Sequence, residues 1–151
     1  MKFASPIPTI YGAVLLLLIP LAAFAQPVTV SDEAVAAHRA ALEVAGAFSN
    51  DGFKLRDGTF SGKIKPKQNV VVQVNLYAGN QYWFSVGATP EAKKMSVAVF
   101  DETGQPVESE LFQQESCASA GFAPASSGPY YVTVQELEGE AATFCFVYSY
   151  K

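Results

Sequence analysis

The sequence has few of the side chains from which catalytic and metal centres are built. Its 151 residues include a single histidine, His38, and two cysteines, Cys117 and Cys145. A Ser-His-Asp site requires an imidazole held between a nucleophile and a carboxylate. A zinc site requires three or four protein ligands that converge on one point. One histidine and two cysteines supply neither set, so we expect a protein that is not an enzyme and carries no cofactor.

Positive charge is also in short supply. The formal net charge is −4, and an acidic protein lacks the basic face that nucleic acids require, so we expect no nucleic-acid partner. The charges are unevenly distributed, because residues 101–140 contain acids and no base, whereas residues 54–67 contain five bases and one acid. Two explanations are open: the segments pair across strands of one domain, or the basic edge meets an acidic surface on a partner.

The longest hydrophobic run is short for a membrane span. Residues 10–19 are almost entirely apolar, whereas a membrane-spanning helix needs about 20 such residues. Lys2 places a positive charge before the run, and Ala23 and Ala25 have the small-x-small spacing that signal peptidase accepts. We therefore interpret residues 1–25 as a secretory signal peptide, cleaved before Gln26. The mature protein would be exported, to a periplasm or out of the cell, and would have no membrane span.

In an oxidising compartment, two cysteines suggest a disulfide. If Ala118 faces inward on its strand, Cys117 faces outward, and if Phe144 faces inward, Cys145 also faces outward. The two thiols then lie on the same side of a sheet and would form a bridge if their strands are neighbours. Such a bridge would contribute about 3 kcal/mol to stability.

Residues 26–52 are expected to form an extended leader and one amphipathic helix. Ser31 has the character of a helix N-cap, and Asp32 and Glu33 follow it in the first turn, where the helix dipole favours negative charge. At helical spacing, the residues that share one face through residue 48 are mostly alanines: Ala34, Ala37, Ala41, Val44, Ala45 and Phe48. Such a face buries little area by itself.

From residue 53 to residue 151 the sequence predicts β-strands. Apolar and polar residues alternate in short runs that end at turn-forming residues. The runs are residues 70–76, 81–87, 94–100, 106–111, 116–122, 130–137 and 142–150. The basic stretch, residues 53–67, would add one or two edge strands. We predict an all-β fold: an antiparallel, jelly-roll-like β-sandwich of about seven or eight strands, residues 53–151, after one N-terminal helix.

The turns between the predicted strands follow a distinctive order. Leu76 and Tyr82 flank a tight turn that contains Ala-Gly-Asn. An Asp-x-x-Gly turn begins at Asp101, and Pro124 precedes the run Ser-Gly-Pro-Tyr-Tyr-Val-Thr-Val at residues 127–134. In this order, the landmarks of about residues 60–150 resemble those of the bacterial pre-peptidase C-terminal (PPC) domains. Those are small β-sandwiches usually appended to secreted proteases and other exported enzymes. The resemblance implies an accessory role, and it does not include the helix.

Carboxylates on turns supply the metal candidates. Asp101 and Glu102 share one turn, and calcium binds six or more oxygens that converge on one point. Asp and Gly are also the residues that a plain turn requires, and we favour that interpretation. Paired carboxylates for glycoside hydrolysis could come from Glu136, Glu138 and Glu140, but we interpret these three as a solvated, charged tip.

Three aromatic side chains are predicted to point away from the core: Tyr77, Trp83 and Tyr131. Exposed Trp and Tyr on a flat sheet stack on sugar rings or anchor a protein partner. The helix could equally cover them, since its alanine face needs an apolar surface. We predict an exported, non-catalytic module that acts in binding or as an accessory, with these residues contacting an unidentified protein or glycan. The alternatives are a carbohydrate-binding module using the exposed aromatics, and a small exported enzyme or enzyme inhibitor.

Overall fold

The chain folds into two packed β-sheets with one helix on the outside of the larger sheet. A computed structural model describes residues 30–151, so the predicted signal peptide and residues 26–29 of the leader lie outside the described residues. The helical elements are α1 (Asp32–Gly46) and the short 3-10 helix η1 (Ser49–Asp51). The strands are β1 (Lys54–Leu55), β2 (Phe60–Ile64), β3 (Asn69–Leu76), β4 (Tyr82–Ala88), β5 (Ala92–Phe100), β6 (Glu110–Gln114), β7 (Cys117–Phe122), β8 (Gly128–Gly139) and β9 (Ala142–Tyr150).

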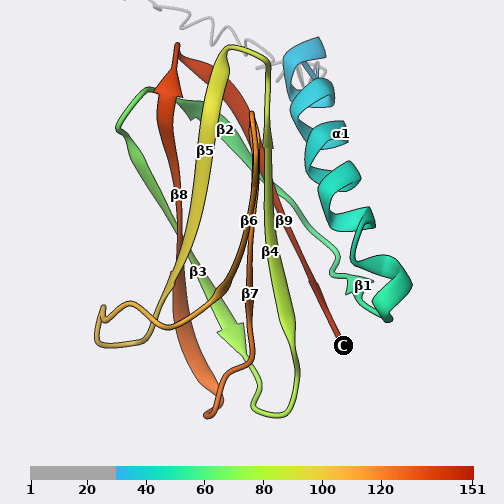
Figure 1. Ribbon diagram of the computed structural model, residues 1–151, viewed down its shortest axis with the longest axis vertical. Coiled ribbons are helices and arrows are strands. Elements are labelled where there is room, and N and C mark those ends of the chain that lie inside the picture. The colour runs from blue at the N-terminus through green and yellow to red at the C-terminus, as the bar shows by residue number, and fades with distance from the viewer. Residues whose placement is uncertain (1–29) are drawn as a thin grey trace, which may run out of the picture.

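All paired strands are antiparallel, and they divide into two sheets (Figure 1). The larger sheet has the order β1-β9-β4-β7-β6, and β2 also pairs with β9. The smaller sheet has the order β3-β8-β5. The predicted fold class, an all-β antiparallel sandwich with one helix, is confirmed. The described residues contain nine strands rather than seven or eight.

The core lies between the two sheets and follows the predicted alternation. In β8, Tyr130, Val132 and Val134 are buried, while the residues between them are partly exposed. From the other sheet, the rings of Phe84 and Phe146 stack in parallel with centroids 6.2 Å apart. Strand β4 departs from alternation, because every one of its residues is buried. One face of β4 meets the core and the other lies under α1.

Helix α1 begins where the sequence predicts it. The backbone N–H of Ala34 donates to Ser31 Oγ at 3.2 Å, which completes the predicted N-cap. Asp32 and Glu33 occupy the first turn. The helix ends at Gly46, two residues before the predicted end, and the chain continues through the single turn of η1 into β1. No helix among residues 30–151 has the length and apolar character that a membrane span requires.

The alanine face of α1 packs directly on the larger sheet. It forms a buried cluster whose members are Ala37, Ala41, Ala45, Cys145 and Val147. The close approach depends on Gly87 of β4, because a Cβ atom there would lie 2.2 Å from the backbone nitrogen of Ala41. A small-residue helix face and a glycine in the strand therefore allow the two backbones to meet.

The first turn of α1 is also attached to the sheet by polar contacts. Glu33 Oε2 accepts hydrogen bonds from Thr143 Oγ1, at 2.9 Å, and from Lys63 Nζ. These bonds, that of Lys63 foremost, lower the pKa of Glu33. Hydrogen bonds to β2 and β9 thus supplement the apolar packing.

The predicted disulfide between Cys117 and Cys145 is wrong, since both cysteines are free. Both cysteines lie on the same side of the sheet, as the alternation predicts, but their strands are not neighbours. Gly87 of β4 pairs with Cys117 on one side and with Cys145 on the other. Two strand spacings separate the cysteines by about 9.6 Å, beyond the roughly 7 Å limit for a disulfide. Burial raises the pKa of both thiols, which disfavours the reactive thiolate.

Candidate functional site

Trp83 lies beneath the segment that follows α1 and is only 8% exposed. The ring of Phe48 stacks on the indole with centroids 3.9 Å apart and planes 7° from parallel. Gly121 of β7 leaves room for the indole, because a Cβ atom there would lie 2.9 Å from the ring. Phe48 therefore covers Trp83, and the indole ring is not available to a ligand on this surface.

Helix α1 leaves the outer surface of the three-stranded sheet uncovered. The helix packs on β4, β9, β7 and β2, all in the other sheet, as Figure 1 shows. We call the outward side chains of the smaller sheet the open face. It consists of Asn69, Val71, Gln73 and Asn75 of β3, Pro129, Tyr131, Thr133, Gln135 and Leu137 of β8, and Ser96, Ala98 and Phe100 of β5.

The strand register arranges the open face in rows. Tyr131, on the central strand, pairs with Gln73 on one side and with Phe100 on the other. The next row joins Val71, Thr133 and Ala98, and the one after it joins Asn69, Gln135 and Ser96. No side chain in these rows carries a charge. Charged side chains are found at one end of the sheet, where Lys94 Nζ and Glu138 Oε1 form an ion pair at 3.8 Å.

Tyr77 lies directly after β3, in phase with the outward residues of that strand, and is 59% exposed. Its backbone N–H donates to the hydroxyl of Tyr82 at 3.0 Å, and Asn80 Nδ2 donates to the same oxygen at 3.2 Å. These bonds hold the tight turn between β3 and β4. Tyr77 and Tyr131 thus belong to the side of the smaller sheet, whereas Trp83 belongs to the larger sheet, so the three predicted contact residues do not form one site.

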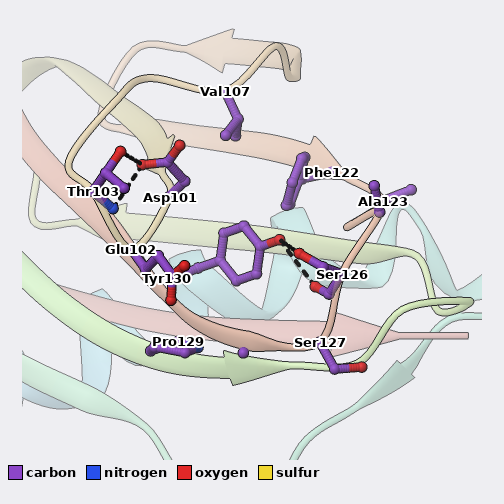
Figure 2. Close-up of a pocket in the computed structure, with 12 residues that line it drawn as sticks. Asp101, Glu102, Thr103, Val107, Phe122, Ala123, Ser126, Ser127, Pro129 and Tyr130 are labelled. Carbon is purple, nitrogen blue, oxygen red and sulfur yellow. Dashed lines mark hydrogen bonds between the residues drawn. The ribbon is translucent and has the colours of Figure 1, made fainter.

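At one end of the sandwich, two loops enclose an open pocket of about 400 Å³ (Figure 2). The β5–β6 loop supplies Asp101, Glu102 and Thr103, and the β7–β8 loop supplies Ser126 and Ser127 among others. Figure 2 shows the ring of Tyr130 between the two loops, with its hydroxyl donating to the Ser126 carbonyl oxygen at 3.0 Å. Ser127 Oγ accepts from the backbone N–H of Ala78 at 2.9 Å. Several polar groups of the pocket are therefore already engaged in hydrogen bonds that hold the surrounding loops in place.

Asp101, the first of the two calcium candidates, is engaged in the same way. Its Oδ1 accepts from Thr103 Oγ1 at 2.7 Å, from the Thr103 backbone at 2.9 Å and from the Gln105 backbone at 2.9 Å. Hydrogen bonds, that of the Thr103 hydroxyl foremost, lower the pKa of Asp101. Within the described part of the chain, no group of three or more His, Cys, Asp or Glu side chains could hold a metal ion. Asp101 Oδ1 therefore holds the backbone of its own turn.

The predicted solvated tip is wrong for Glu136, which is buried, whereas Glu138 and Glu140 are exposed as predicted. Its side chain is 0% exposed, and neither carboxylate oxygen has a hydrogen-bond partner. It is in phase with the buried residues Tyr130, Val132 and Val134 of β8, which extends to Gly139. The alternation could therefore have revealed the position of Glu136. Burial raises the pKa of its carboxyl group, which favours the protonated form.

The ion pairs between residues 30 and 151 do not connect the basic and acidic segments. Lys63 pairs with Glu33 of α1, and Lys94 pairs with Glu138. Neither pair joins residues 54–67 to residues 101–140, so the cross-strand explanation of the charge distribution finds no support. The single histidine, His38, lies partly exposed on α1.

No model of a protein family matches this sequence, and comparison with curated proteins finds no match. The resemblance to PPC domains therefore stays a prediction.

Proposed function

We propose that the protein is an exported, non-catalytic binding module that acts through the open face. The observation that carries the proposal is the contrast between the two outer surfaces of the sandwich. On the larger sheet, α1 and Phe48 cover Cys145, Val147 and Trp83. On the smaller sheet the outward residues lie in regular rows around Tyr131 and Phe100, with no helix of the described chain above them.

The rigidity of its three strands also supports the open face as the binding surface. The open face is carried by strands with continuous registers, Asn69–Leu76 against Gly128–Gln135 and Met95–Phe100 against Tyr131–Glu136. Side chains on paired strands keep fixed spacings, and a site of this kind loses little conformational entropy when it binds. The pocket between the β5–β6 and β7–β8 loops, here called the loop-end pocket, is a weaker candidate for a binding site. The polar groups of Asp101, Ser127 and Tyr130 already form hydrogen bonds within the protein.

The biological setting that we propose is that of an accessory to secreted or envelope proteins. The predicted signal peptide supports export, and the resemblance to PPC domains supports the accessory role. In such a role the module would hold an exported enzyme or its substrate in place and would perform no chemistry itself.

Nuclear magnetic resonance mapping tests the proposal. The ¹⁵N-labelled mature protein is titrated with polysaccharide and protein fractions of the cell envelope and the culture medium. We expect shift changes to gather on β3, β8 and β5. Thr133→Glu, which places a charge at the centre of the open face, should abolish them. Gln114→Glu adds the same charge to an exposed position of β6 in the other sheet and should bind as wild type. Changes centred on α1 or on the loop-end pocket, or normal binding by Thr133→Glu, would contradict the proposal.

A further inference from the structure

We propose that the ligand of the open face is an uncharged polysaccharide chain. This inference rests on the proposed function, and it adds the chemical class of the ligand. The open face combines partly exposed aromatic side chains with side-chain amides and hydroxyls, and its rows lack charge. Each of these three features matches a property of a neutral sugar polymer.

The aromatic part is the pair formed by Tyr131 and Phe100, which lie directly opposite one another on neighbouring strands. Both side chains are partly exposed. Their backbones are about 4.8 Å apart, so both aromatic side chains project from the same row of the same side of the sheet. The C–H face of a sugar ring packs against such a surface, because an aromatic ring offers a large apolar area at little entropic cost.

The polar part surrounds this pair with groups that both donate and accept hydrogen bonds. Gln73 flanks Tyr131 in the same row, and Asn75 lies one row beyond it on β3. Gln135 lies two rows in the other direction. An amide has two donor hydrogens and an acceptor oxygen, and a sugar hydroxyl has one donor and two acceptor positions, so the two groups satisfy one another without any formal charge.

The electrostatics argue against charged polymers. A polyanion needs cations on the surface that it meets, and the rows of the open face contain none. Asp101 directly follows Phe100 at one end of the face, and its lowered pKa keeps it ionised at neutral pH. At the other end, the charge of Lys94 is offset by Glu138, and Lys67, whose backbone N–H donates to the Glu136 carbonyl oxygen, lies beyond the last row. The face is therefore matched to a ligand without charge.

The shape favours a chain over a single sugar. Consecutive rows are two residues apart along each strand, which is about 6.7 Å. With the row of Asn75 and Pro129, the face has four rows, which extend over roughly 20 Å. Three strands give the face a width of about 10 Å between the outer backbones. The surface is long and narrow, as an extended polymer requires.

Affinity electrophoresis tests the inference. The mature protein is run in native gels that contain a soluble β-glucan, xylan, galactomannan or, as the charged comparison, dextran sulfate. We expect at least one neutral polymer to retard the wild-type protein, dextran sulfate to have no effect, and added salt to leave the retardation unchanged. Tyr131→Ala should weaken binding about tenfold. Gln73→Ala, whose side chain is exposed and outside the core, should weaken it about fivefold. Tyr150→Ala, on β9 of the other sheet, is the matched control and should bind as wild type.

The outcomes separate this inference from the proposed function. Retardation by a neutral polymer that Tyr131→Ala and Gln73→Ala weaken supports it. If no neutral polymer retards the protein, or if only dextran sulfate does, the inference is overturned. A protein fraction that shifts the open face in the Thr133→Glu experiment would then leave the proposed function standing with a different ligand. If Tyr131→Ala does not fold, Gln73→Ala alone decides, and unchanged binding by that variant overturns the inference.

Discussion

The stack of Phe48 on Trp83 should hold the segment after α1 against the sheet, and Phe48→Ala should release it. The phenyl ring is partly exposed, so its burial contributes about half of the 1.5–3 kcal/mol of a fully buried side chain. A parallel aromatic pair adds roughly 1 kcal/mol. We therefore expect the variant to lose about 2 kcal/mol of unfolding free energy, or roughly 8 °C in Tm for a domain of this size.

Trp83 is the single tryptophan of the chain, and its fluorescence reports directly on the cover. In Phe48→Ala the emission should shift to longer wavelength and acrylamide should quench it more strongly, because water reaches the indole. Urea unfolding followed by the same signal gives the free energy. The matched control is Phe60→Ala on β2, whose ring is 45% exposed and packs against Phe144. That variant should also lose stability, but its native emission should equal that of wild type. Unchanged emission and quenching in Phe48→Ala would refute the reasoning.

Three further predictions concern the helix contact, the buried carboxyl group and the loop-end turn. Gly87→Ala should cost about 1–3 kcal/mol in urea unfolding, since its Cβ would meet Ala41, whereas Gly46→Ala, where nothing lies within 4 Å, should cost nothing. Glu136→Met should raise the unfolding free energy at pH 7 by about 1–3 kcal/mol, because it removes a buried group without partners. The folded wild type binds the Glu136 proton more tightly than the unfolded chain, so wild-type stability should fall as pH rises above about 4.5. The advantage of Glu136→Met should therefore shrink in acid, and an advantage that does not change with pH would contradict this. Asp101→Ala should speed hydrogen exchange at the Gln105 amide about fivefold, and an unchanged rate would contradict the turn assignment. The pKa of Asp101 is lowered, so acid should produce the same loosening in wild type as pH falls through the titration of this carboxyl group.

Local patterns predicted most of the fold. Period-two alternation located the strands and identified inward residues such as Val132 and Val134, because one face of each strand packs in the core and the other faces water. The N-cap at Ser31 fixed the start of α1 for a similar reason, since capping involves residues close in sequence. The same alternation places Glu136 on the buried face of β8. We did not predict its burial because carboxyl groups are rarely buried without a partner.

Features that depend on which strands are neighbours could not be predicted. The disulfide failed because β4 lies between Cys117 and Cys145, and strand order is set by contacts distant in sequence. The cover over Trp83 depends on Gly87 admitting the helix and on Phe48 reaching across β4, and neither is visible as a pattern. The open face also required the register, since Phe100 and Gln73 become partners of Tyr131 only through β8.

Hydroxyl-radical footprinting of the mature protein, read by mass spectrometry, tests the central claim that one outer surface is covered and the other is free. We expect oxidation of Tyr77 and Tyr131 in the native state, together with protection of Trp83 that disappears in urea. Native oxidation of Trp83 as fast as in urea, with Tyr131 protected, would contradict it.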